Sequence, residues 1–186
     1  EDIRECIAHH AHSSALAIRA GFDGVEITSF MGYLLANFLS SFTNQRTDEY
    51  GGSVENRARF LVELIDGIKQ EIGDHPLAIR LNGAELMDQW GGNTVDECFE
   101  IMHIAADAGM DMLSMTVGWQ EAPESSIGRD VPPGHWNYLA ARAKKELPDL
   151  PLAYGGRLPD PVMAEECLND GIFDFWEVCR PLLADP

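Results

Sequence analysis

The sequence predicts an α/β fold with a parallel sheet, because short apolar strands alternate with amphipathic helices along its whole length. A glycine marks the end of several helices, at Gly21, Gly73 and Gly109, and a strand follows each of them. Repeated units of this kind join parallel strands by right-handed crossovers. The five units fit either an open doubly wound sheet or a piece of a barrel. No GxGxxG motif follows a strand, which weakens the dinucleotide-binding form of the open sheet.

The individual elements follow from this periodicity and from the turn residues between them. Helices are expected at residues 4–20, 56–72, 94–108, 136–146 and 161–169. Strands are expected at residues 24–27, 77–81, 112–115, 152–154 and 175–178. The second helix shows the pattern most clearly, since Leu61, Leu64, Ile65 and Ile68 share one face. No linker or domain boundary interrupts the series, so we expect a single domain.

The charge and length limit the classes of function. The 186 residues include 31 acidic and 13 basic side chains, for a formal charge of −18. This balance argues against nucleic acid or a membrane surface as partner and favours a small-molecule substrate. A complete eightfold β/α barrel needs about 250 residues, and this chain opens on Glu1 without a leader. We therefore expect a soluble fragment of a cytoplasmic protein, and homo-oligomerisation stays open.

Metal sites are not expected from the cysteines and histidines. The four cysteines lie far apart and form no CxxC pair, which excludes zinc or iron–sulfur ligation by such pairs within this chain. Buried thiols in a reducing compartment are the simpler interpretation. The six histidines share no ligand spacing, and His9 and His12 are better explained as a solvated helix face.

Arginines and glycines at strand ends are the candidate ligand-binding residues, because loops at the carboxyl edge of parallel strands carry function. Arg80 ends an apolar strand and must meet a carboxylate, a ligand or solvent. A structural ion pair and a ligand contact are equally open for it. The other candidates follow the last two strands, where barrels often bind phosphate, although plain turns or surface charges are the alternatives: Gly155, Gly156, Arg157, Cys179 and Arg180.

Two further polar residues are candidates for contact with a substrate. Tyr33 follows the first strand and could donate a proton, although a tyrosine there is more often a packing residue. Gln120 follows the third strand and could contact substrate or cap its loop.

Several motifs, foremost among them Asn44–Ser53 and Glu55–Arg57, together resemble the old yellow enzyme family of FMN oxidoreductases, near its 2,4-dienoyl-CoA reductase and trimethylamine dehydrogenase branch. The most specific lies in the long loop after the first strand, at Asn44-Gln-Arg-Thr-Asp-Glu-Tyr-Gly-Gly-Ser53 and Glu55-Asn-Arg57. The resemblance continues at Gly21–Ile27, Gly32–Leu35, Ala78–Leu81, Val117–Trp119 and Arg180–Pro186. It covers nearly the whole chain.

This resemblance implies a partial (β/α)₈ TIM barrel, with residues 1–186 as the C-terminal part of one FMN-binding domain. The five strands would be the fourth to the eighth, and the N-terminal barrel strands would be missing. Arg80 would lie by the N1/O2 edge of the flavin, and Tyr33 would protonate the substrate. The FMN phosphate would be held by Gly156, Arg157 and Arg180.

The resemblance also implies the chemistry, which is NAD(P)H-linked reduction of an enone, enoyl or dienoyl substrate. In this branch a 4Fe-4S cluster and an FAD domain usually follow the barrel, beyond the present chain. The chain has Thr28, Met31 and Gln120 at positions where many relatives carry other polar residues, in particular a histidine at the position of Gln120. These departures leave an amine dehydrogenase or demethylase as an alternative. A non-flavin lyase or isomerase that uses the same phosphate site also remains open, and the missing strands leave open a non-catalytic remnant.

Overall fold

The computed structural model describes residues 1–185, which contain one parallel five-stranded sheet. The strands pair in chain order, each parallel to the next. They are β1 (Val25–Ser29), β2 (Leu77–Ala84), β3 (Met112–Val117), β4 (Leu152–Tyr154) and β5 (Phe175–Trp176). This arrangement confirms the predicted α/β fold with parallel strands, because each connection returns the chain to the same end of the sheet.

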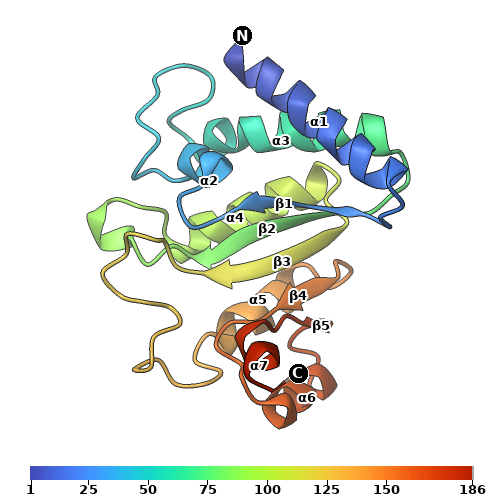
Figure 1. Cartoon of the computed structure of the whole chain (residues 1–186). Coiled ribbons are helices and arrows are strands. Elements are labelled where there is room, and N and C mark those ends of the chain that lie inside the picture. Colours follow the sequence, from blue (N-terminus) through green and yellow to red (C-terminus); the bar gives the residue numbers. More distant parts are fainter. Residues whose placement is uncertain (186) are drawn as a thin grey trace.

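The helices follow the sheet in the same order, from α1 at the top of Figure 1 to α6 at its bottom. α1 (Asp2–Arg19) precedes β1, and the helices that connect the strands are α3 (Val54–Ile72), α4 (Val95–Asp107), α5 (Asn137–Glu146) and α6 (Pro161–Asn169). Three short helices lie in loops: α2 (Leu34–Leu39), the 3₁₀ helix η1 (Asp88–Trp90) and α7 (Arg180–Ala184). The sequence periodicity did not predict these three, because elements of three to six residues are too short to show a helical repeat.

The sheet curls, and the clearest sign is a contact between strands that are not neighbours. Arg80 on β2 forms an ion pair of 2.6 Å with Glu177, which follows β5. In a flat sheet these strands would lie about 14 Å apart, three strand spacings of roughly 4.8 Å. Arg80 also meets Glu26 on β1 at 3.3 Å. The polar groups therefore share the concave face, as in part of a barrel.

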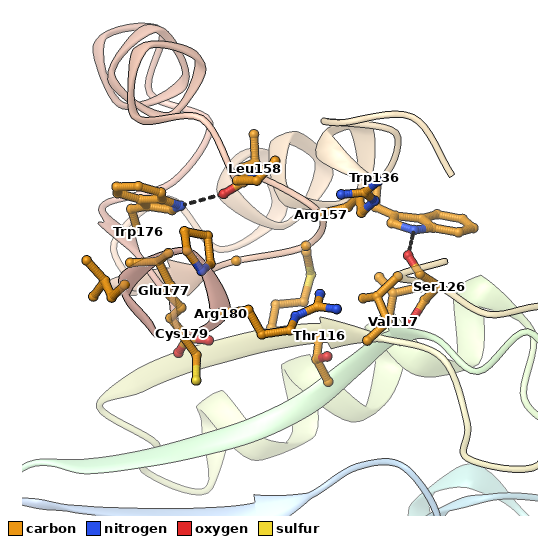
Figure 2. A pocket seen from close by; sticks show the side chains of 18 of the residues that line it. Thr116, Val117, Ser126, Trp136, Arg157, Leu158, Trp176, Glu177, Cys179 and Arg180 are labelled. Atoms are coloured by element: carbon orange, nitrogen blue, oxygen red, sulfur yellow. Dashed lines mark hydrogen bonds between the residues drawn. The ribbon is translucent and has the colours of Figure 1, made fainter. Parts of the chain in front are cut away.

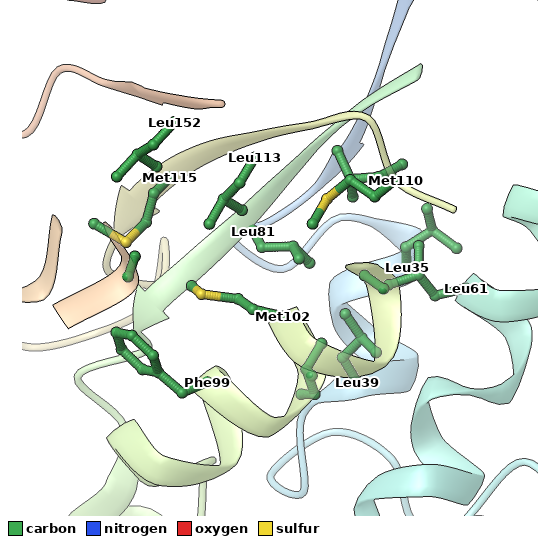
Figure 3. Close-up of a cluster of buried hydrophobic side chains, with 14 of the residues drawn as sticks. Leu35, Leu39, Leu61, Leu81, Phe99, Met102, Met110, Leu113, Met115 and Leu152 are labelled. Carbon is green, nitrogen blue, oxygen red and sulfur yellow. The ribbon is translucent and has the colours of Figure 1, made fainter. Parts of the chain in front are cut away.

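The apolar core lies between the other face of the sheet and its helices (Figure 3). The predicted helix face is confirmed, since Leu61, Leu64, Ile65 and Ile68 of α3 are each at most 1% exposed. Buried side chains of β2, β3 and α4, such as Leu81, join the same cluster. The hydroxyl of Ser53 caps α3, and Gly73 ends it in the left-handed region at φ 62°.

The ends of several elements differ from the sequence-based expectation. β2 extends to Ala84, because the segment after Arg80 continues to pair with β3 through a register shift between Asn82 and Ala84. β5 is only two residues long, since Glu177 turns away toward the concave face.

The two edge strands of the sheet are β1 and β5. Each edge offers backbone N–H and C=O groups for further pairing. Separately, none of the helices within residues 1–185 combines the length and the apolar character needed to span a membrane.

Candidate functional site

A pocket of about 670 Å³ opens at the carboxyl ends of β2, β3, β4 and β5 (Figure 2). Six of the residues predicted from the sequence line it together: Arg80, Gly155, Gly156, Arg157, Cys179 and Arg180. Its apolar lining includes Met115, Val117 and Trp136. The pocket thus combines cationic groups with apolar walls and lies where parallel β/α folds place their ligands.

Gly155 and Gly156 are glycines because the chain approaches itself closely at the end of β4. A Cβ atom on Gly155 would lie 2.2 Å from the carbonyl oxygen of Glu177. A Cβ atom on Gly156 would lie 2.2 Å from the hydroxyl of Tyr154. A larger residue at position 155 would displace the segment after β5, and one at position 156 would displace the Tyr154 ring, so both glycines shape the floor of the pocket.

Arg157 holds the long loop that follows β3. Its Nε donates to the carbonyl oxygens of Gly128 and Val131, at 3.1 and 3.0 Å. In Figure 2, Arg157 lies beside Trp136, whose Nε1 donates to the Ser126 carbonyl at 2.8 Å. These bonds fix the 126–131 segment at one side of the pocket. The terminal guanidinium nitrogens of Arg157 are not used in them.

Arg180 and Cys179 form the opposite part of the rim and are both exposed. Arg180 begins α7, directly before Pro181, after the chain has left β5. The proline is suited to the first turn of a helix, where no intrahelical donor is needed. Because Arg180 is exposed and lines the pocket, its side chain is accessible to an anionic group.

Arg80 lies in a closed polar network on the concave face. Its Nε donates to the Ser114 hydroxyl at 2.8 Å, and its Nη2 donates to Glu177 at 2.6 Å. The Ser114 hydroxyl in turn donates to the other carboxylate oxygen of Glu177 at 2.6 Å. With Glu26 at 3.3 Å and the Phe30 ring at 5.6 Å from its Cζ, the guanidinium is held on several sides. The ion-pair interpretation of Arg80 is thus correct, and Arg80 still lines the pocket.

Tyr33 lies in a second, more open pocket of about 590 Å³, together with Thr28 and Phe30. Its side chain is 55% exposed and meets the Phe30 ring edge-on at 5.9 Å. Arg80 lines both pockets and so joins them.

Gln120 is exposed and lines neither of these two pockets. Its neighbour Trp119 is buried, and its indole packs against Gly32, where an added Cβ would lie 3.2 Å from the ring. The loop that carries Gln120 therefore adjoins the loop that carries Tyr33, although the two side chains are not placed in one pocket.

A buried polar cluster lies behind the Tyr33 loop, around Glu85. This carboxyl group is 3% exposed, and its burial raises its pKa from 4.5 to about 7. Hydrogen bonds from Asn93 and Ser40 and the charge of Arg57 act in the opposite direction, whereas Glu97 adds to the rise. Burial also strongly raises the pKa of the neighbouring Cys98 thiol. The cluster therefore holds a carboxyl group that titrates near neutral pH.

The sequence alone did not identify four residues of these two networks: Glu177, Ser114, Glu26 and Glu85. Two sequence features could have indicated site residues. Ser114 is a polar residue within an apolar strand, and Glu177 is a carboxylate at a strand end. These features become partners of Arg80 only once the curvature of the sheet is known.

The cysteines only partly follow the prediction of buried thiols. Cys98 and Cys167 are buried and Cys6 is half-buried, whereas Cys179 is exposed because it lies in the rim of the pocket. Residues 1–185 contain no group of three or more metal-ligating side chains.

Comparison with known proteins places this geometry in a family. Residues 1–186 match the NADH:flavin oxidoreductase / NADH oxidase family. The chain is 34% identical to the cinnamate reductase of Clostridium sporogenes over 206 residues, which cover 100% of the chain and 30% of that protein. Two solved structures are also similar. A complex of 2-naphthoyl-CoA reductase with 2-naphthoyl-CoA has 44% identity and a TM-score of 0.94, over 99% of this chain and 28% of that one.

The second structure is histamine dehydrogenase from Rhizobium sp. 4-9, with 30% identity and a TM-score of 0.84. The similarity covers 100% of this chain and 27% of that one. The chain thus spans less than a third of each of these three proteins. Because the family match extends over its full length, the chain belongs to the NADH:flavin oxidoreductase / NADH oxidase family, that of the old yellow enzymes.

Proposed function

We propose that the complete protein is an FMN-dependent reductase that uses NADH or NADPH to reduce a conjugated enone, enoyl or dienoyl compound. The observation that carries this proposal is the pocket that Arg80, Arg157 and Arg180 line together with the glycines at the end of β4, next to the pocket of Tyr33. Two relatives are named as reductases of cinnamate and of 2-naphthoyl-CoA, both conjugated compounds. This supports the choice of substrate class.

The pocket has the size and the donor groups that FMN requires. Its volume of about 670 Å³ is within the range of small-molecule and cofactor sites. Arg180 is exposed at the rim, and the terminal nitrogens of Arg157 remain available, so both can bond a phosphate. Met115 and Trp136 supply apolar surface for an aromatic ring system. We assign the phosphate to Gly156, Arg157 and Arg180.

Arg80 is assigned to the N1/O2 edge of the flavin ring, where a positive charge favours reduction. Its anchoring by Ser114 and Glu177 supports this role, because a preorganised charge needs no rearrangement during the reaction.

Proton delivery is assigned to Tyr33. Bound FMN supplies hydride transfer between the nicotinamide and the substrate. Tyr33 acts as a general acid from its open pocket and donates a proton to the carbon next to the one that receives the hydride. Gln120 can orient a substrate oxygen but cannot ionise. Reduction of the double bond is complete with one hydride and one proton.

The chain is proposed to form the C-terminal part of a single FMN-binding barrel, whose other strands lie elsewhere in the protein. The edges at β1 and β5 and the 28% coverage of the naphthoyl-CoA reductase support this. A 4Fe-4S cluster and an FAD domain would also lie outside residues 1–186. The four free cysteines suit a reducing compartment, in agreement with a cytoplasmic location.

Cofactor analysis of the complete protein tests the proposal. We expect a yellow protein that releases FMN, identified by mass, at about one per chain, and whose flavin absorbance is bleached by anaerobic NADH or NADPH. Cinnamate or 2-cyclohexenone should then restore the absorbance. A colourless protein after reconstitution with FMN would contradict flavin binding. Bleaching by histamine without nicotinamide would instead identify an amine dehydrogenase.

A further inference from the structure

The helix that begins at Tyr33 ends in a buried polar cluster. Tyr33 is the N-cap of the six-residue helix α2, which ends at Leu39. The polar cluster consists of four side chains that are at most 5% exposed: Ser40, Arg57, Glu85 and Asn93. We call these four residues the Glu85 cluster. It joins the loop after β1, the start of α3 and the loop after β2.

The last carbonyl group of α2 accepts two hydrogen bonds from this cluster. The Leu39 carbonyl oxygen is 2.8 Å from Arg57 Nε and 3.1 Å from Asn93 Nδ2. Both donors satisfy a carbonyl that a helix end leaves without an intrahelical partner. The charge of Arg57 also suits the negative end of the helix. The next residue, Ser40, donates its hydroxyl to Glu85 at 2.8 Å.

Glu85 determines the orientation of Asn93. One carboxylate oxygen of Glu85 accepts from the Asn93 backbone N–H at 2.9 Å, and the other accepts from its Nδ2 at 3.0 Å. The Asn93 Oδ1 atom meanwhile accepts from Arg57 Nη2 at 2.9 Å and from the Ser41 N–H at 3.2 Å. Reversing the Asn93 amide would oppose donors to donors and acceptors to acceptors, so Glu85, together with Arg57 and the Ser41 N–H, fixes the one orientation that reaches Leu39.

α2 depends on such contacts for its position. A helix of six residues is marginal without tertiary support, and no side chain caps its first turn. Its buried residues Leu35, Ala36 and Leu39 face the core. The Tyr33 side chain is 55% exposed, so its place is set by the backbone of α2 and its preceding turn more than by packing.

We propose that Glu85 and Asn93 are positioning residues for Tyr33, and that they act through the C-terminal end of α2. The expected effect on the rate of substrate reduction rests on the proposed role of Tyr33 in proton delivery. The structural part of the proposal, that the Glu85 cluster sets the place of the Tyr33 ring, can be tested without any reaction.

The structural test uses the complete protein with 3-fluorotyrosine incorporated at position 33 and observed by fluorine NMR. Ser40→Ala removes the donor to Glu85, and Glu85→Gln keeps the shape of the side chain but loses its charge. We expect either variant to shift or split the signal at position 33. If Glu85→Gln does not fold, the fluorine signal of Ser40→Ala alone tests whether the cluster positions Tyr33. The matched control is Ser53→Ala, which removes the N-cap hydroxyl of α3, 3.4 Å from the Asn56 amide, without a contact to α2.

The kinetic test compares the same variants with 2-cyclohexenone as probe. A displaced Tyr33 should lower the rate of substrate reduction about 10- to 100-fold and leave flavin reduction by NADPH unchanged. In a Tyr33→Phe background the substitutions should have no further effect, because coupled residues are not additive.

The inference is wrong if Ser40→Ala perturbs the fluorine signal no more than Ser53→Ala does. It is equally wrong if the losses simply add to that of Tyr33→Phe. If the signal moves but Tyr33→Phe itself costs no rate, the positioning is upheld and the proposed acid role of Tyr33 is the part that fails.

Discussion

Arg157 and Arg180 line the same pocket, but their side chains differ in what they already contact. Arg157 uses its Nε on the carbonyls of Gly128 and Val131, whereas Arg180 is exposed at the rim. The first arginine therefore has a structural task in addition to the proposed phosphate contact. For Arg180, the proposed contact with the phosphate is the evident role.

This difference predicts distinct phenotypes for the two alanine variants. Arg180→Ala should lower the affinity for FMN by about 10- to 100-fold, the loss expected for one charge-assisted hydrogen bond, and leave riboflavin affinity unchanged. Arg157→Ala should weaken both ligands, because the 126–131 segment loses its anchor. Fluorescence titration of the apoprotein with each flavin measures this. Equal losses of FMN and riboflavin in Arg180→Ala would exclude a phosphate contact.

At the residue scale, the sequence identified Arg80 but not its partners. A lone guanidinium at the end of an apolar strand signals a buried or ligand-binding charge. Glu177 lies 97 residues away, and no local pattern links it to Arg80. Only the curl of the sheet brings β2 and β5 together, and that curl depends on pairing across the whole domain.

At the scale of elements, the long helices and strands could be predicted from their periodicity, and the loop helices could not. α2 has six residues, and its position depends on contacts to Glu85 and Asn93 that lie 45 to 54 residues away. Arg57 closes the loop motif on which the family resemblance is based, and its Nε bonds the Leu39 carbonyl. Which end of α2 it would hold could not be inferred.

The raised pKa of the Glu85 carboxyl group predicts how the stability of the protein changes with pH. Its pKa is raised in the folded state from 4.5 to about 7. Between these values the unfolded chain releases the proton and the folded chain retains it, so the free energy of unfolding falls as pH rises. The span corresponds to about 3 kcal/mol. The glutamine in Glu85→Gln does not titrate. The free energy of unfolding of the native protein, relative to that of this variant, should therefore decrease by about 3 kcal/mol between about pH 4.5 and 7.

Urea unfolding of both proteins across this pH range provides the measurement. The groups that do not interact with Glu85 titrate alike in both proteins, so their contributions cancel in the difference. A difference that stays constant with pH would show that the Glu85 carboxyl group has its ordinary pKa in the folded protein.

At the scale of the whole molecule, the chain forms a curved sheet whose edges at β1 and β5 are available for pairing. Residues 1–186 expressed alone should therefore associate or aggregate, and should bind FMN more weakly than the complete protein does. Light scattering coupled to gel filtration would show this, with the complete protein as reference. A stable monomer that binds FMN stoichiometrically would indicate that the proposed remaining strands are not needed.

Stopped-flow measurement of the two half-reactions tests the proposed reduction of a conjugated substrate with Tyr33 as proton donor. In the complete protein, Tyr33→Phe should slow substrate reduction by about 10²- to 10⁴-fold, the usual contribution of a general acid. Flavin reduction by the nicotinamide should hardly change, because that half-reaction needs no proton from Tyr33. Substrate reduction at the same rate in Tyr33→Phe and the native protein would show that Tyr33 is not the proton donor.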